Sequence, residues 1–331
     1  MFKKYNSIEN TYRKEFLEKI KGHGFWEDEY VVQEKVHGSN ISFWTTNGVN
    51  YQAAKRSGNI VDGEAFYRFD YLLEKHKMAF ASIWNTLKST HSDLEQMTIY
   101  GEVMGGNYPH PEVDRIKDAS KVQKGIFYGP DNYFYAFDIL LNADKYLNVE
   151  EANKHFEKEE LLYAKTLFKG SIEECMTYTN SFDSTIPKEL GLPELTPNIC
   201  EGTIIRPIIN SHFNGGNRVI LKNKNDAWAE KIKSDKKIRL QANVPEHIRV
   251  LQEAILDYVT ENRLNNVVSK IGKVSMPDFG KVLGLFNKDV IEDFLKDHEV
   301  KFTELDKKER KMVTKSFTRT AATMVRNKLR R

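Results

Sequence analysis

Hydrophobic and polar residues alternate in short runs along the first 235 residues, and turn residues such as Gly and Asn separate the runs. Alternation with a period of two, together with many Val, Ile, Tyr and Phe residues, is typical of β-strands. The dipeptide Asn47-Gly48 between two of these runs predicts a hairpin turn. The predicted strands span 30–35, 41–45, 49–54, 98–103, 133–140, 203–208 and 218–222.

Segments without this alternation lie between the predicted strands. They predict helices over 3–21, 64–90 and 149–163 and loops over 104–131 and 181–200. Strands that follow one another through short turns favour antiparallel sheets with inserted helices over a doubly wound parallel sheet. We therefore expect an α+β domain of antiparallel sheets with flanking helices over 1–235.

The remaining part of the chain has a helical pattern. Apolar residues recur there at the i, i+3 and i+4 spacing of an amphipathic helix, for example at Ile248, Leu251 and Ile255. Asn287, and Thr303 with Asp306 three residues on, indicate helix starts. A final helix is predicted from an apolar stripe of Met312, Val313, Phe317, Met324 and Val325. The charged stretch before this part contains a proline, so we predict a linker over 236–245 and a small all-α domain over 246–331.

Length and composition agree with two soluble domains. The chain has 331 residues, and about 150 residues per domain is a fair prior. No apolar run is long enough for a transmembrane helix, and the start MFKKYNSIENTYRK lacks the apolar core of a secretory signal. Two cysteines give neither a disulfide framework nor a CxxC metal site. We expect a cytoplasmic monomer that does not contact membranes.

Charge is unevenly distributed along the chain. Residues 236–331 carry 21 Lys+Arg against 13 Asp+Glu, a net charge of +8, whereas residues 1–235 carry 29 against 34, a net charge of −5. A basic C-terminal third next to an acidic body indicates a polyanionic partner for that third. A solvated helix face with a basic tail explains the same charges, and charge alone does not decide between them.

Several common nucleotide and hydrolase motifs are absent. The sequence has no GxxxxGK[ST], no GxGxxG after a strand, no HExxH and no GxSxG. One lysine, Lys35, has an unusual setting. It ends a strand-like run, and it is followed by a His37-Gly38 turn and then by a second strand. A glycine and free backbone amides beside an amine would let a phosphate approach closely. The tetrad KxxG itself occurs six times, so this window alone favours an ordinary surface lysine.

The segment from Lys35 to Asn40, KVHGSN, resembles the nucleotidyl-transfer motif of polynucleotide ligases and RNA capping enzymes. His37 stands where DNA ligases and capping enzymes usually carry aspartate, and this feature resembles the RNA ligase 2 family. That family includes a T-even phage enzyme and the kinetoplastid RNA-editing ligases. The opening MFKKY and the later VVSKIGK are also similar to the phage enzyme, so the resemblance covers most of the chain.

Further elements of the family match in order, and the resemblance implies a role for each. Arg56 in KRSG would contact the nucleotide or the RNA end, and Glu102 would bind the ribose hydroxyls. Phe137 would stack on adenine, and Glu34 and Asn40 would also contact the cofactor. Glu201 would face a metal ion, together with Asp138. The cofactor-binding and catalytic set implied in this way is Glu34, Lys35, His37, Asn40, Arg56, Glu102, Phe137, Lys222 and Lys224, and the metal set is Glu201 and Asp138.

The resemblance implies an ATP-dependent RNA ligase that forms AMP-lysine on Lys35 and then seals a 3′-hydroxyl to a 5′-phosphate, at nicks in duplex RNA. A free lysine is protonated at neutral pH, so neighbouring cations, a metal ion or desolvation must activate it. Lys222, Lys224 and Mg²⁺, with Mn²⁺ as an alternative, would supply this charge and stabilise the phosphate oxygens. The implied partners are ATP and RNA, and the implied setting is RNA repair in a phage-infected cell.

Other interpretations remain open at this point. Phe137 lies in an aromatic strand where core packing is the ordinary role, and each carboxylate and lysine could be a surface residue. A DNA ligase or a GTP-dependent capping enzyme would use the same scaffold, although His37 argues against both. A nucleic-acid-binding module without catalysis would leave the ordered set of motifs unexplained. Two departures from the family are a long 104–131 loop and Arg206 at a position where lysine is common, and arginine and lysine are not equivalent at phosphate.

Overall fold

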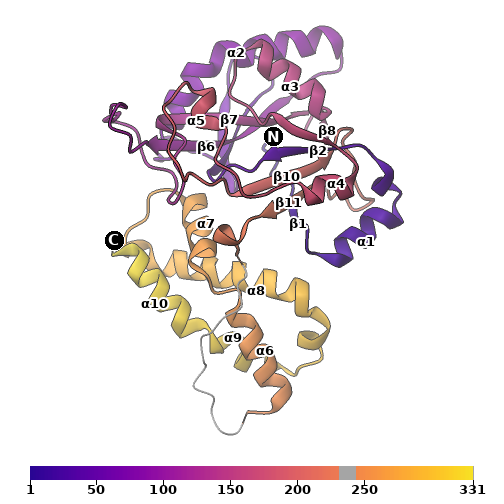
Figure 1. The fold of residues 1–331 in the computed structure, drawn as a ribbon, viewed down its shortest axis with the longest axis vertical. Helices are drawn as coiled ribbons and strands as arrows, with labels where there is room; N and C mark the ends of the chain where they lie inside the picture. Colours follow the sequence, from indigo (N-terminus) through magenta and orange to yellow (C-terminus); the bar gives the residue numbers. More distant parts are fainter. Residues whose placement is uncertain (231–243, 331) are drawn as a thin grey trace. The chain divides into compact units, whose positions relative to one another are not determined.

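The computed structural model describes residues 1–230 and 244–330 of the chain, which form two compact units (Figure 1). The units comprise Met1–Ala227 and Trp228–Arg331. The first unit is α+β, and the described residues of the second beyond Trp228 form helices without strands, so the predicted fold class is confirmed. The predicted domain limit after residue 235 and most of the linker over 236–245 lie outside the described residues, and these limits stay a prediction.

Two sheets form the framework of the first unit. The strands β1 and β11 pair in parallel, and the other strand pairs of both sheets are antiparallel. The first sheet has, in spatial order, β1 (Glu9–Asn10), β11 (Leu221–Lys224), β10 (Gly202–Pro207), β2 (Tyr30–Glu34) and β9 (Thr166–Gly170). The second sheet has β5 (Gly58–Asn59), β4 (Gln52–Lys55), β3 (Ser39–Thr45), β6 (Met97–Asn107), β7 (Gly129–Leu141) and β8 (Lys145–Tyr146).

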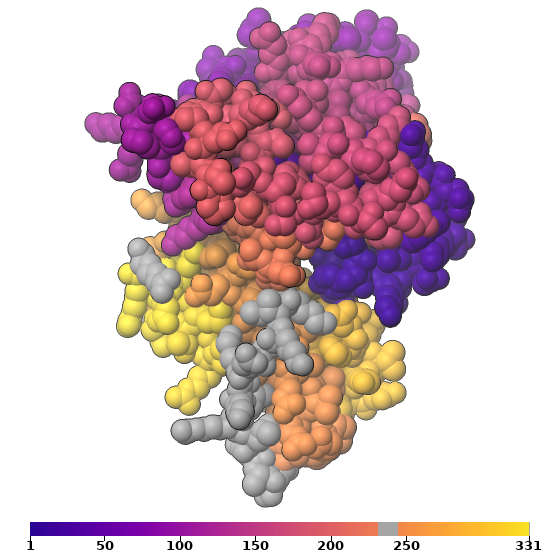
Figure 2. Space-filling view, in the orientation of Figure 1, coloured from indigo at the N-terminus to yellow at the C-terminus, as the bar shows by residue number. Residues whose placement is uncertain are grey.

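Each sheet packs against helices through its apolar face. The helices α2 (Phe69–Thr90) and α3 (Val149–Lys158) share one core with the second sheet, in which Phe80 of α2 contacts Phe43 and Phe134. Burial of each large apolar side chain of this kind contributes about 1.5–3 kcal/mol. The helices α1 (Lys14–Gly22) and α4 (Ile172–Thr177) share a second core with the first sheet, and α5 (Ile186–Glu189) lies in the loop after α4. Figure 2 shows α1, in indigo, on the outside of this unit.

The N-terminal segment differs from the prediction. A helix was expected over 3–21, but only Lys14–Gly22 is helical, and the residues before β1 have no regular secondary structure. Their polar groups bond to the second sheet instead of to one another. The hydroxyl of Tyr100 donates to the carbonyl of Lys3 (2.6 Å), and the hydroxyl of Tyr5 donates to Asp138 (2.6 Å). These long-range contacts override a local helical pattern.

The predicted strands are present, with shifted ends, and the Asn47-Gly48 hairpin between β3 and β4 is confirmed. The loop predicted over 104–131 is shorter, because β6 runs on to Asn107 and β7 begins at Gly129. Three short strands, β1, β5 and β8, and the edge strand β9 were not predicted. They are two to five residues long. Alternation of apolar and polar residues with a period of two cannot be recognised over so few positions.

The second unit is a bundle of helices around its own apolar core, which includes Leu251, Phe286 and Val325. Asn287 does not start a helix as predicted, because α8 already begins at Phe279, after a turn capped by Ser275 and Asp278. The predicted start at Asp306 is confirmed, since its side chain caps α9 together with Glu309. The apolar stripe predicted as one helix divides between α9 and α10. The helices are α6 (Glu246–Leu256), α7 (Glu261–Ile271), α8 (Phe279–Thr303), α9 (Lys307–Ser316) and α10 (Thr318–Leu329).

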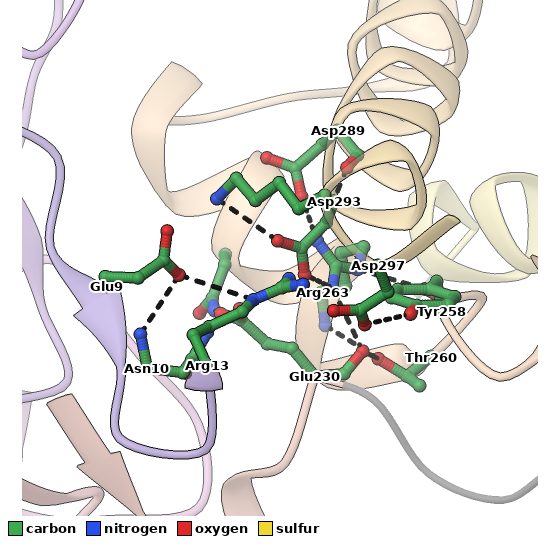
Figure 3. A network of polar contacts seen from close by, with 12 residues as sticks. Glu9, Asn10, Arg13, Glu230, Tyr258, Thr260, Arg263, Asp289, Asp293 and Asp297 are labelled. Carbon is green, nitrogen blue, oxygen red and sulfur yellow. Dashed lines mark hydrogen bonds and ion pairs between the residues drawn. The ribbon is translucent and has the colours of Figure 1, made fainter. Parts of the chain in front are cut away.

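A buried arginine connects three segments of this unit (Figure 3). Arg263 is 2% exposed, and its guanidinium forms ion pairs with Asp289 (2.7 Å) and Asp293 (2.6 Å) of α8. It also donates to the carbonyls of Tyr258 (3.0 Å) and Glu230 (3.2 Å). A buried cation is tolerated only when it is paired and fully hydrogen-bonded, and Arg263 meets this condition. The network therefore fixes the start of the unit to α7 and α8.

Candidate active site

Lys35 directly follows β2, at the start of the turn that leads into β3. Its backbone N–H donates to the carbonyl of Gly202 (2.9 Å), so the pairing between β2 and β10 continues to the lysine. Gly38 in the same turn lies against β6, where an added Cβ would be 2.5 Å from the carbonyl oxygen of Val103. The turn is therefore fixed on one side by the first sheet and on the other by the second sheet.

Glu201 lies at the centre of the cationic residues that the sequence analysis singled out. Its carboxylate contacts Lys35 Nζ (2.7 Å), Lys224 Nζ (2.6 Å) and His37 Nδ1 (3.3 Å). The side chain is 2% exposed. Burial by itself would raise the pKa of Glu201, but the charges of Lys224 and Lys35 and the contact with His37 hold that pKa well below its ordinary value. Glu201 is therefore a stable anion that orients both lysines.

A cavity of about 570 Å³ opens beside Lys35. Six of the predicted cofactor-binding residues line it, and they come from both sheets and from the turns that follow their strands. A concave site lined by apolar side chains and a few polar groups suits a small organic ligand. The lining residues are Tyr5, Ile8, Gln33, Glu34, Lys35, Val36, Asn40, Arg56, Glu102, Tyr135, Phe137, Ala164, Ile204, Arg206 and Ile220.

The polar wall of the cavity comes from the second sheet. Asn40 on β3 and Glu102 on β6 are directly paired in register, so their side chains share one face of the sheet. Arg56 follows β4, the strand that pairs with the other edge of β3. The structure thus brings together an amide, a carboxylate and a guanidinium that are far apart in the sequence. Such a set can bind hydroxyl groups and phosphates.

The aromatic wall consists of Phe137 and Tyr5. Phe137 is half-buried on β7, and its ring packs edge-to-face against Tyr5 with the centroids 4.9 Å apart. The backbone carbonyl of Phe137 accepts a hydrogen bond from Arg206 (2.9 Å). Core packing alone does not describe this position, because Phe137 also lines the cavity. A base can stack on a ring held in this way.

The two distant lysines lie on β11. Lys224 contacts Glu201 directly, and Lys222 is two residues away, so both side chains share one face of the strand. Lys222 is paired in register with Ile204, which lines the cavity. Side chains opposite each other in antiparallel strands lie on the same face, so Lys222 is on the cavity side of the first sheet.

Glu34 lines the cavity, but its carboxylate has other partners. It accepts hydrogen bonds from the hydroxyl of Ser184 (2.6 Å) and from the backbone N–H and the hydroxyl of Thr185 (2.8 Å each). Burial raises the pKa of Glu34, and these bonds oppose the shift. The carboxylate therefore anchors the loop before α5, and only the rest of Glu34 is available to a ligand in the cavity.

Asp138 does not fit the metal-binding role that the resemblance implied. Its side chain is fully buried and is not among the residues that line the cavity. Its carboxylate accepts ion pairs from Arg206 and Arg218 (2.8 Å each) and the hydrogen bond from Tyr5. Burial would raise the pKa of Asp138, but the two arginines lower it. Asp138 is a structural anion, and a sequence pattern that places Asp next to Phe137 cannot distinguish the two faces of β7.

Glu201 is the carboxylate that a divalent cation could use here. The described residues contain no cluster of three or more His, Cys, Asp or Glu side chains suited to a metal ion. Mg²⁺ commonly uses one or two protein carboxylates and takes its other ligands from water and substrate phosphates. The donor set therefore fits a cation that arrives with a phosphate substrate and does not fit a permanent protein cage.

Sequence reasoning missed three parts of the cavity. Tyr5 and Ile8 were assigned to a helix, although the N-terminal segment forms one wall. Arg206 was noted only as a departure from the family, yet it lines the cavity and pairs with Asp138. The opening motif MFKKY was a signal for Tyr5. It lies too far along the chain from the other motifs to indicate a contact with them.

Known RNA ligases are similar to this chain over most of its length. The RNA ligase family pattern matches residues 28–224, and a second pattern, described as T4 RNA ligase 2 C-terminal, matches residues 242–323. The chain is 30% identical over 353 residues to RNA-editing ligase 2, mitochondrial, of Trypanosoma brucei brucei, which covers 90% of this chain and 84% of the relative. It is 27% identical to RNA-editing ligase 1, mitochondrial, of the same organism, over 83% of this chain and 71% of the relative.

The chain therefore belongs to the RNA ligase family, in the branch of RNA ligase 2, and the predicted resemblance and the predicted enzyme class are confirmed. The alternatives of a capping enzyme, a DNA ligase and a non-catalytic module receive no support from these relatives. A solved RNA ligase of Naegleria gruberi with ATP and Mn is 13% identical to this chain, with a TM-score of 0.44. It covers 69% of this chain, and the chain spans 57% of that ligase.

The relatives in Trypanosoma are mitochondrial proteins, so they do not support the expected phage-infected cell. None of the helices in the described part of the chain is long and apolar enough to cross a membrane.

Proposed function

We propose that this RNA ligase uses ATP to seal 3′-hydroxyl and 5′-phosphate ends at nicks in duplex RNA, with Lys35 as the nucleophile. The observation that carries the proposal is the contact of Lys35, His37 and Lys224 with one buried carboxylate, Glu201, beside a cavity lined by Arg56 and Phe137. A nucleophilic lysine needs surrounding charge that favours attack on a phosphate and a surface that holds the nucleoside.

In the first step, Nζ of Lys35 attacks the α-phosphorus of ATP. A nitrogen–phosphorus bond forms, the bond to the β-phosphate oxygen breaks, and pyrophosphate leaves while the amine loses a proton. Glu201 lies 2.7 Å from Nζ and directs the amine, but its low pKa makes it a poor final acceptor of that proton, which passes to water. Lys224, and Lys222 on the same strand face, would stabilise the charge on the phosphate oxygens.

The other lining residues would orient the nucleotide. Phe137 would stack on the adenine, Glu102 would accept hydrogen bonds from the ribose, and Arg56 and Asn40 would contact phosphate oxygens. These roles follow from the chemistry of each side chain and its position in the cavity. A divalent cation, Mg²⁺ or Mn²⁺, would neutralise phosphate charge when bound, with Glu201 as its protein ligand.

In the later steps, AMP passes from Lys35 to the 5′-phosphate of the RNA, and the 3′-hydroxyl displaces AMP to form the phosphodiester. The helical second unit, whose chain segment carries the excess of Lys and Arg, would bind the RNA phosphates. This division of labour and a monomeric enzyme are part of the proposal.

The test is covalent labelling with ATP that carries a label on its α-phosphate. We expect the wild-type chain to retain the label after denaturation and Lys35→Ala to retain none. Lys55→Ala is the matched control, because Lys55 ends the strand β4 and begins a KxxG tetrad, but its amine pairs with Glu64. An unlabelled wild type, or label that persists in Lys35→Ala, contradicts the proposal. A comparison of nicked RNA, DNA and hybrid duplexes then identifies the preferred substrate.

A further inference from the structure

The loop between β6 and β7 reaches the turn that carries the nucleophile. Tyr128, at the end of this loop, is fully buried. The backbone N–H of His37 donates to the hydroxyl oxygen of Tyr128 (2.8 Å). His37 is two residues from Lys35, and its ring contacts the same carboxylate oxygen of Glu201 as the lysine does. A shift of this backbone therefore moves both contacts to Glu201.

The neighbouring loop residues hold Tyr128 in place. The backbone of Phe127 exchanges two hydrogen bonds with the side-chain amide of Asn198: its N–H donates to Oδ1 (2.9 Å), and its carbonyl accepts from Nδ2 (2.7 Å). Asn198 belongs to the loop before Glu201, and its own N–H donates to Asp183 (2.6 Å). The two loops that the sequence left without a role thus pack together behind the lysine turn.

We propose that Tyr128 is a positioning residue for the adenylylation step, because its hydroxyl oxygen holds the backbone of His37 and thereby the reactive turn. The ring of Tyr128 packs in the interior, and its hydroxyl oxygen accepts the hydrogen bond from the buried amide of His37. The phenol remains neutral at physiological pH, since burial first, and then the charge of Glu34, raise the pKa of Tyr128 well above its ordinary value. This inference rests on the proposed function of Lys35.

The decisive variant is Tyr128→Phe, which keeps the ring and removes only the acceptor. A displacement of reacting groups by about 1 Å can cost about 100-fold in rate, so we expect the rate of lysine labelling at saturating ATP to fall by at least about tenfold. The concentration of ATP that gives half the maximal rate should change less than threefold, because the cavity wall is unaltered. Sealing of RNA that already carries AMP on its 5′-phosphate should be retained, because that step does not use Lys35 as a nucleophile.

The matched control is Tyr108→Phe. Tyr108 lies at the other end of the same loop, and its hydroxyl donates to the carbonyl of Pro193, away from the lysine turn. We expect this variant to label at the wild-type rate. Equal labelling rates for Tyr128→Phe and the wild type would overturn the proposal. Loss of labelling together with loss of sealing and a lower melting temperature would also overturn it, since Tyr128 would then support only the fold. A wild type that takes no label would instead contradict the function proposed for Lys35.

Discussion

At the scale of single residues, the site depends on the charge of one carboxylate. Glu201 contacts Lys35, Lys224 and His37, which come from two short motifs far apart along the chain. Removal of one partner from a buried ion pair is typically costly, about 3–5 kcal/mol, because the remaining charge stays buried and unpaired. The same carboxylate therefore serves both the stability and the chemistry of the first unit.

The first prediction concerns the pH dependence that follows from Glu201. Its pKa in the folded state is lower than in the unfolded chain, so its contribution to the unfolding free energy is fully present above about pH 4.5 and is lost as the pH falls below that value. Glu201→Gln should be less stable than the wild type at pH 7, and the difference should shrink between pH 5 and pH 3.5. Urea unfolding at several pH values measures this. Glu157→Gln, at an exposed position, should show no such trend; a constant difference for Glu201→Gln would contradict the assignment.

The order of residue types along the chain predicted six of the side chains that line the cavity, but not the direction of every side chain. Glu34 was predicted to contact the cofactor and Asp138 to bind a metal ion, and the carboxylate of each contacts protein groups. Adjacent residues on a strand point to opposite faces, so Phe137 lines the cavity whereas its neighbour Asp138 does not. Which of the two faces the cavity depends on strand pairing, and the sequence does not contain that information locally.

At the scale of elements, the turn after β2 is fitted closely against β6. The sequence analysis assigned Gly38 to the approach of a phosphate, whereas the structure shows that its missing side chain makes room for protein. An added Cβ would lie 2.5 Å from the carbonyl oxygen of Val103 and 3.1 Å from Cβ of Glu102. The contacted oxygen belongs to the backbone of a central strand, which cannot move without disturbing its pairs with β3 and β7.

We predict that Gly38→Ala displaces the turn and not the strand. The labelling of Lys35 should fall by about 100-fold, consistent with a displacement of the amine by about 1 Å. The unfolding free energy should fall by about 1–3 kcal/mol, the usual cost of overpacking. Gly22→Ala provides the control, because an added Cβ there meets no atom within 4 Å. Wild-type labelling by Gly38→Ala would show that the turn tolerates the side chain.

The elements that the sequence predicted well are the ones with a clear pattern or cap within a short stretch of sequence. The long alternating strands β3, β6 and β7 and the capped helix α9 were found near their true positions. The N-terminal segment was misassigned because its contacts, to Tyr100 and to Asp138, join residues more than 90 positions apart. No window of neighbouring residues contains such a signal.

At the scale of the whole molecule, the chain combines an α+β unit with a helical unit whose chain segment is basic. Lys307, Lys308 and Lys311 are exposed on α9 at the start of the most basic stretch of the chain. They neither line a core nor belong to the Arg263 network, so their ordinary explanation is a solvated face. The proposed function gives them a second explanation, as contacts to RNA phosphates.

Salt dependence separates these two explanations. For a duplex, the slope of log K against log salt concentration decreases by about 0.9 for each lost phosphate contact. We predict that Lys307→Ala, Lys308→Ala and Lys311→Ala combined weaken the binding of nicked RNA and reduce the slope by about 0.9 for each lysine that contacts a phosphate, while the labelling of Lys35 by ATP is unchanged. The control combines alanine at Lys77, Lys145 and Lys154, three exposed lysines of the first unit. An equal change in slope for both triple variants would mean that RNA responds to net charge alone, and the helical unit would then not be the RNA-binding part.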